Sequence, residues 1–203
     1  MSLFSMFFFI SLYMQQVLGY DPLKAGVSYL PLAAGIIVAA GAASGLVTRF
    51  GVKPVLVSGL VLTAGGLVWF AQISVSGSYL SDILGPSLLS AFGLGLAFVS
   101  MTVAAVAGVE PHESGLASGL INTSQQVGGA LGLAILVAIS NSRRDSVLPS
   151  VHSVPAAVTE GFQLALTVGA GFAIVGALLA LALVSGSGAE QNSGEVEAVP
   201  VTA

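Results

Sequence analysis

Charge is what this sequence lacks most. Of its 203 residues only 7% are charged, with 5 Lys+Arg and 9 Asp+Glu, while 55% are hydrophobic. A soluble domain carries about 25% charged residues, and it needs them to cover its surface in water. The composition therefore excludes an ordinary water-soluble domain and predicts a chain whose surface lies in a lipid bilayer.

Other absences narrow the range of functions. The sequence contains no cysteine, which excludes disulfides and thiolate metal sites, and we expect neither a metal nor a cofactor. The few cations are scattered and form no basic stripe, so nucleic acid is not an expected partner. Both histidines, His112 and His152, fall between the apolar segments, so neither is expected at membrane depth as a catalytic base. We therefore do not expect the chain to be an enzyme.

In place of charged residues, the sequence has long uncharged windows. Six of them run for about 20 to 29 residues, enough to cross ~30 Å of hydrocarbon as a helix. They lack the alternating polarity of a membrane β-barrel. The sequence thus predicts an all-α integral membrane protein, with a six-transmembrane-helix bundle over residues 1–184. The expected helices are 1–18, 25–47, 54–73, 82–108, 115–139 and 161–184.

The connections predict how these helices are arranged. Most are short, which makes neighbouring helices antiparallel; the longest predicted connection lies between Ser140 and Glu160. Residues 185–203 are polar and acidic without periodicity, which predicts a disordered tail. Met1 stands almost at the expected membrane edge, so we expect the first helix to lack its opening turn.

Glycine is abundant, with 26 residues, and much of it falls inside the windows. Glycines four residues apart allow helix backbones to approach closely. Such pairs indicate a moving helix interface, or else static packing or chance in a chain rich in glycine and alanine, and either interpretation favours a compact bundle. The pairs are Gly41/Gly45, Gly115/Gly119 and Gly128/Gly132.

Three segments carry a family resemblance. Leu12 to Gly26 (LYMQQVLGYDPLKAG), Leu46 to Pro54 (LVTRFGVKP) and Ser118 to Gly132 (SGLINTSQQVGGALG) frame most of the chain. They resemble the fourteen-helix, EmrB/QacA-type drug:proton antiporters of the major facilitator superfamily. The first is similar to the hairpin that opens the C-terminal half of that family, and the third to a helix found in these exporters. The second resembles a degenerate copy of the cytoplasmic loop motif, with Thr48 where the full motif has Asp.

The resemblance implies that the chain is the C-terminal half of a multi-pass transporter of the cell membrane. It places the loop motif of Arg49, Gly51 and Lys53 in the cytoplasm and the stretch from Ser140 to Glu160 outside. The charges do not support this orientation, because the cations expected outside outnumber those expected inside, although earlier helices largely set the topology of a complete transporter. The outside cations are Lys24, Arg143 and Arg144.

The resemblance also implies a mechanism in which two six-helix bundles rock about a site at the bilayer midplane. The implied partners are the bilayer, the missing N-terminal half, a small lipophilic substrate and the coupling proton. An ionisable group within the membrane is expensive and therefore usually functional. The acidic residues Asp82, Glu110, Glu113 and Glu160 all fall at window edges or in predicted loops, so we expect the coupling carboxylate in the N-terminal half.

Polar side chains within the windows are the candidates for the site. Asn122 and Gln126 lie four residues apart on one face of the fifth predicted helix, with Gln125 beside them. They line the substrate cavity or hydrogen-bond across the central interface between the two halves; alternatively they join helices within the bundle, where such bonds contribute about 0.6 kcal/mol each. Toward the outer end of the first helix, substrate contact and an interfacial role are equally open. The residues there are Tyr13, Gln15 and Gln16.

Two other classes of function stay open at this stage. The chain is alternatively a non-transporting fragment of a disrupted transporter gene, or a membrane scaffold that binds a partner through its helices. The short first helix favours the fragment over the scaffold.

Overall fold

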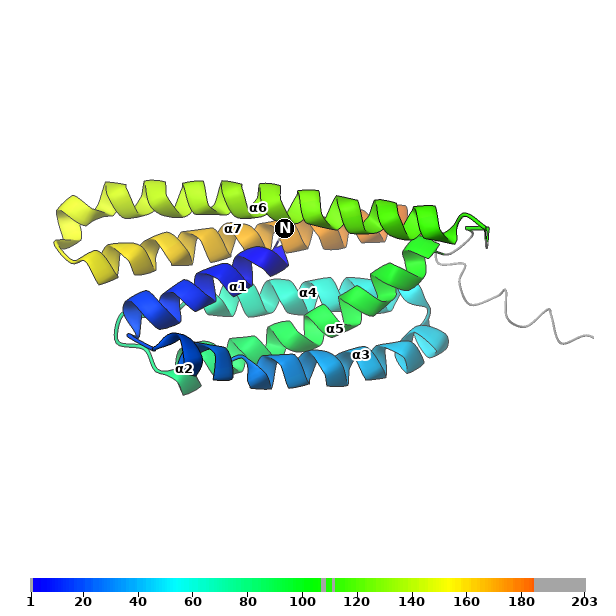
Figure 1. Cartoon of the computed structure of the whole chain (residues 1–203), viewed down its shortest axis with the longest axis horizontal. Coiled ribbons are helices and arrows are strands. Elements are labelled where there is room, and N and C mark those ends of the chain that lie inside the picture. Colours follow the sequence, from blue (N-terminus) through cyan, green and yellow to red (C-terminus); the bar gives the residue numbers. More distant parts are fainter. Residues whose placement is uncertain (1, 107–108, 111, 185–203) are drawn as a thin grey trace, which may run out of the picture.

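The chain forms a bundle of six helical rods in a computed structural model that describes residues 2–106, 109–110 and 112–184 (Figure 1). Successive rods run in opposite directions, so their connections alternate between the two ends of the bundle. The elements are α1 (Ser2–Leu12) with the π-helix η1 (Tyr13–Val17), α2 (Pro22–Val27) with α3 (Leu30–Phe50), α4 (Val52–Phe70), the π-helix η2 (Tyr79–Leu84) with α5 (Gly85–Val106), α6 (Ser114–Val151) and α7 (Val154–Leu183). The predicted all-α membrane bundle is confirmed.

Length and hydropathy fit a bilayer. Among the described residues, five of the rods are long and apolar enough to cross a membrane. The first rod is also apolar, over Phe4–Val17, but it is shorter than the other five.

Close backbone approach holds α3, α4 and α5 together. A side chain added at Gly59 of α4 would place its Cβ 2.6 Å from the Ala97 backbone nitrogen and 2.8 Å from the Gly93 carbonyl oxygen, both on α5. On the other side of α5, a Cβ at Gly95 would lie 2.7 Å from the Ile36 carbonyl oxygen of α3. Only glycine allows these contacts, because any side chain would have to push the helices apart.

The glycine pairs predicted for helix packing lie elsewhere. A Cβ added at any of five of these glycines would meet no atom within 4 Å, so they make no close helix contact in the described structure. Gly132 alone of the six is buried. These small residues lie on helix faces that the described residues leave uncovered, so their predicted part in helix packing stays a prediction. The five open glycines are Gly41, Gly45, Gly115, Gly119 and Gly128.

A second packed layer joins α1 to the α6–α7 hairpin. α6 packs along α7, α7 packs on α4, and α1 lies across both α6 and α7. The contact is aromatic, with the ring centroids of Phe9 and Phe162 5.4 Å apart. Phe9, Ile10 and Leu136 are almost completely buried there, so this layer closes the core of the bundle.

The main correction concerns the predicted long loop. The stretch from Ser140 to Glu160 is helical except for His152 and Ser153, because α6 continues to Val151 and α7 begins at Val154. Charged residues end an apolar window without ending a helix. Pro155 occupies the first turn of α7, where the missing N–H breaks no helical bond. The turn itself comes at His152, which adopts a left-handed conformation with φ 49.

The other helix bounds differ from the predicted ones by a few residues. The second helix begins earlier than predicted, with Pro22 at its start and the Asp21 carboxylate accepting a hydrogen bond from the Lys24 backbone N–H at 2.9 Å. A bend at Ser28 and Tyr29 then separates α2 from α3. The predicted disordered tail, residues 185–203, lies outside the described residues.

Candidate functional site

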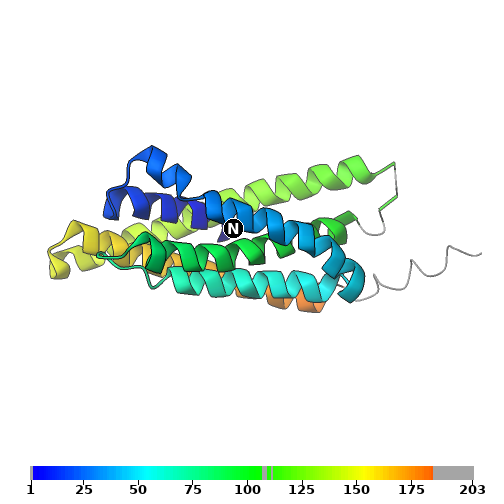
Figure 2. The ribbon, with the colours of Figure 1, turned by 90° about the horizontal axis from the view of Figure 1, so that it is seen from below.

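The amide side chains of α6 lie on an uncovered helix face. Asn122 and Gln126 are exposed, and Gln125 is half-buried. Gly115 and Gly119 continue the same face one and two turns earlier, since the spacing of these four residues is four, three and four. Figure 2 shows this N-terminal part of α6 standing apart from α3, α4 and α5. Among the described residues, nothing lies within 4 Å of a Cβ added at Gly115 or Gly119, so this face presents exposed amides beside small, open positions.

The same face becomes covered further along α6. Gly129 is buried, and a Cβ there would lie 2.6 Å from the Phe4 ring of α1. Phe4 of α1 therefore covers the face at Gly129, whereas a Cβ at Gly115 or Gly119 would meet no described atom within 4 Å. We call the open part, formed by Gly115, Gly119, Asn122 and Gln126, the α6 polar face.

The second predicted group, in η1, divides into two environments. Gln15 and Gln16 are exposed, but Tyr13 is buried, with 0% of its surface exposed. Its hydroxyl donates to the Ser74 carbonyl oxygen at 2.6 Å and lies 3.2 Å from Asp82 Oδ2. Tyr13 therefore connects the end of the first rod to the connection between α4 and η2.

Asp82 is the centre of this polar junction. Its Oδ2 also accepts hydrogen bonds from the Ser74 backbone N–H at 3.0 Å and from Ser74 Oγ at 3.3 Å, and its Oδ1 accepts one from Ser81 Oγ. Asp82 belongs to η2 and Tyr13 to η1, so the two π-helices meet through their side chains. Sequence reasoning placed Asp82 at a window edge and missed this contact, since no local pattern connects positions so far apart.

The loop motif forms the tight turn that the resemblance implies. Gly51 alone separates α3 from α4, with φ 84, a conformation that favours glycine. Its N–H donates to the Val47 carbonyl oxygen at 2.8 Å. Arg49 is exposed and stacks near the Phe50 ring, with its Cζ 5.3 Å from the ring centroid. This turn and the α6–α7 turn lie at opposite ends of the bundle (Figure 1), as predicted.

The comparisons with known proteins agree with this architecture. The model of the Major Facilitator Superfamily matches residues 1–133. The chain belongs to the major facilitator superfamily. As a member of this superfamily with membrane-spanning helices, it is a multi-pass protein of the cell membrane.

Three of the similar proteins are named as antibiotic resistance or export proteins. The chain is 34% identical over 186 residues to the puromycin resistance protein pur8 of Streptomyces alboniger, covering 90% of this chain and 37% of that protein. It is 35% identical over 136 residues to the cephamycin export protein CmcT of Amycolatopsis lactamdurans, covering 66% and 28%. It is 36% identical over 144 residues to the tetracenomycin C resistance and export protein of Streptomyces glaucescens, covering 70% and 26%. The chain thus spans well under half the length of these superfamily relatives.

Proposed function

We propose that the chain is one six-helix half of a transporter that exports small lipophilic drugs in exchange for protons. The observation that carries the proposal is the α6 polar face, which the described residues leave uncovered. The names of the relatives, which are resistance and export proteins, support drugs as the substrate class.

Gln126 lies inside the expected membrane span and Asn122 near its edge, and polar side chains there need a partner. An amide that faces hydrocarbon leaves hydrogen-bonding groups unsatisfied, each at a cost of several kcal/mol. Among the described residues, Asn122 and Gln126 have no hydrogen-bond partner. A partner would have to approach α6 from outside this bundle. Gly115 and Gly119 lie on the same face with open space above them, so a second bundle could come close there.

A partner bundle gives this face two roles. Where it touches the partner, the small residues allow close approach; where the two bundles diverge, Asn122 and Gln126 would line the substrate path with Gln125 beside them. Gln15 and Gln16 are exposed at the end of η1, and in this proposal they contact substrate near one mouth of the path. Tyr13 stays outside the path because it is buried.

The proton is assigned to the other half. Among the described residues, the acidic side chains lie near the ends of the rods, and Asp82 is already held by four hydrogen-bond contacts. Alternating access requires two bundles that rock against each other. The missing partner is therefore a similar six- to eight-helix bundle that supplies the coupling carboxylate.

Efflux of a fluorescent lipophilic cation from cells, with and without a proton gradient, tests this proposal. The 203-residue chain alone should not drive efflux, and co-expression with a matching N-terminal half should restore it. Gln126→Leu should then reduce efflux more than Leu181→Ala, since Leu181 is an exposed side chain on the apolar helix α7. Gradient-driven efflux by the chain alone would contradict the proposal.

A further inference from the structure

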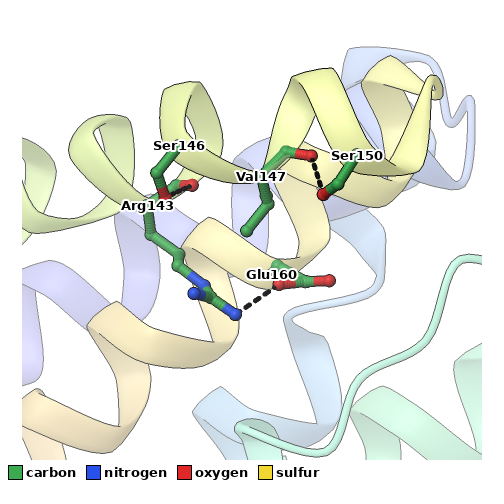
Figure 3. Close-up of polar contacts among 5 residues, drawn as sticks. All are labelled: Arg143, Ser146, Val147, Ser150 and Glu160. Atoms are coloured by element: carbon green, nitrogen blue, oxygen red, sulfur yellow. Dashed lines mark hydrogen bonds and ion pairs between the residues drawn. The ribbon is translucent and has the colours of Figure 1, made fainter.

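The hairpin of α6 and α7 carries a cluster of charge at the end where its helices join. Arg143 Nη2 donates to Glu160 Oε2 at 2.8 Å across the two helices, as Figure 3 shows. The next residue, Arg144, pairs with its neighbour Asp145 instead, also at 2.8 Å. Four charged groups therefore lie close together, and only the Arg143 pair bridges the helices.

The depth of the Arg143–Glu160 pair follows from α7. This helix contains no charged residue after Glu160, and its remaining length is close to the ~20 apolar residues that cross the hydrocarbon core. Glu160 thus marks the level at which α7 leaves the hydrocarbon. Arg143, bonded to it, lies at the same level, which is that of the lipid headgroups.

An open hollow of about 450 Å³ lies beside the pair. Its α6 residues share one helix face, since they recur at three- and four-residue spacing. The lining changes from apolar to polar along the helix axis: apolar side chains line the part toward the hydrocarbon, and a guanidinium with two hydroxyl-bearing side chains lines the part toward water. The apolar residues are Ala138, Ile139 and Leu164, and the polar residues are Ser142, Arg143 and Ser146.

Arg143 has donors to spare for a ligand. Its guanidinium has five N–H groups, and the described ion pair uses only Nη2. The side chain is 46% exposed, so the remaining donors are accessible from the hollow. Ser146 Oγ donates its proton to the Arg143 carbonyl oxygen at 2.8 Å (Figure 3), so the guanidinium supplies the donors for a phosphate. Guanidinium groups favour phosphate because the planar fork binds two oxygens at once.

We propose that this hollow binds one phospholipid, with its phosphate on Arg143 and an acyl chain against Ala138, Ile139 and Leu164. A phospholipid has the same order of polarity along the membrane normal as the lining: charged phosphate at the headgroup level, then glycerol, then hydrocarbon. Glu160 has a distinct part in this site. It competes with the phosphate for the Arg143 guanidinium, so it limits how tightly the lipid binds.

Lipid binding to the purified 203-residue chain, measured by native mass spectrometry in detergent, tests the site. The probe is dioctanoyl phosphatidylglycerol, and dioctanoylglycerol serves as the same lipid without phosphate. Arg143→Gln should weaken phosphatidylglycerol binding about tenfold, the effect of losing charge-assisted hydrogen bonds. Dioctanoylglycerol binding should change much less.

Two matched variants separate a lipid site from general charge or stability effects. Arg144→Gln removes the same charge one residue away, outside the lining, and should leave binding unchanged. Glu160→Gln should tighten binding severalfold because it frees Arg143, whereas a purely structural ion pair predicts no gain. Equal weakening by Arg143→Gln and Arg144→Gln, or weaker binding in Glu160→Gln, would overturn the proposal.

A third variant and a competitor complete the test. Leu164→Trp fills the apolar part of the hollow without touching the ion pair and should reduce binding, even if Arg143→Gln lowers the helical content. Unchanged binding in Leu164→Trp would refute the site. Inorganic phosphate should not displace the lipid at equal concentration, and displacement would show a simple anion site instead.

Discussion

The contribution of the polar junction at the end of the first rod can be tested by removing a single oxygen atom, the Tyr13 hydroxyl. Tyr13→Phe removes the hydroxyl that donates to the Ser74 carbonyl oxygen at 2.6 Å and contacts Asp82 Oδ2 at 3.2 Å. The aromatic ring is retained, and Tyr13 is 0% exposed. The substitution therefore opens almost no cavity, and its effect measures the hydrogen bonds.

The expected loss in the free energy of unfolding depends on the groups that Tyr13→Phe leaves without a hydrogen-bond partner. Asp82 keeps its bonds from Ser74 and Ser81, so the carboxylate stays satisfied. The Ser74 carbonyl loses its donor, and a buried group left without a partner costs about 1 to 3 kcal/mol. Ser74 itself is exposed, so water can partly replace the hydroxyl. We expect a loss of about 1 kcal/mol in the free energy of unfolding, within the range measured for hydrogen bonds in membrane proteins.

Unfolding of the purified chain by SDS in mixed micelles provides the assay. The fluorescence of Trp69, the single tryptophan, reports on the end of α4, next to the connection that holds Ser74. Tyr20→Phe is the matched control, since the Tyr20 hydroxyl makes no hydrogen bond among the described residues and its ring contact with Lys24 Nζ at 3.8 Å survives. If both variants unfold within about 0.3 kcal/mol of each other, the junction contributes nothing and the reasoning fails.

Three further predictions follow from the packing and the topology. Gly59→Ala should lower the free energy of unfolding by about 1 to 3 kcal/mol through overpacking, because its Cβ would lie 2.6 Å from the Ala97 backbone nitrogen. Gly65→Ala on the same helix is the control for the same unfolding assay. Its Cβ would lie 3.6 Å from a Leu89 methyl, so it should cost little. Gly41→Ala should also be tolerated in this chain, since nothing lies within 4 Å of its Cβ; a loss as large as that of Gly59→Ala would contradict the open face. In intact cells, a single cysteine at Ser146 should react with a membrane-impermeant thiol reagent and one at Thr48 should not; the reverse pattern would overturn the predicted orientation.

Most of the fold could be predicted from the sequence, because the hydrophobic effect determines which segments lie in the bilayer. A helix that spans lipid must be apolar over its whole length, so the windows located every rod. They failed at Arg143, Arg144 and Asp145, since a helix that continues into water needs no apolar residues. Helix hydrogen bonding continues to Val151 regardless of charge. An uncharged window therefore indicates the part of a helix that lies in lipid, not the whole helix.

The candidate site was predicted in part. The shared face of Asn122 and Gln126 followed from helical periodicity, and the structure leaves both exposed. The environment of Tyr13 did not follow, because its partners Ser74 and Asp82 lie far along the chain and come together only through the antiparallel return of α4 and η2. Local spacing predicts which residues share a face, and only the tertiary fold shows whether that face is covered.

Two groups of polar side chains in this chain differ in what they contact. Those near one end bond to the chain's own backbone: Tyr29 Oη donates to the Phe7 carbonyl oxygen at 2.9 Å, Tyr79 Oη to that of Ser28 at 2.9 Å, and Gln163 Nε2 to that of Ile73 at 2.7 Å. Together with the Tyr13 junction, these bonds join four of the six rods at that end. A bundle that rocks as a unit must keep its own helices together while its contacts with the other half change. In the function proposed above, the bonds within the chain keep its helices together, and the α6 polar face, where Asn122 and Gln126 make no such bond among the described residues, would contact the other half.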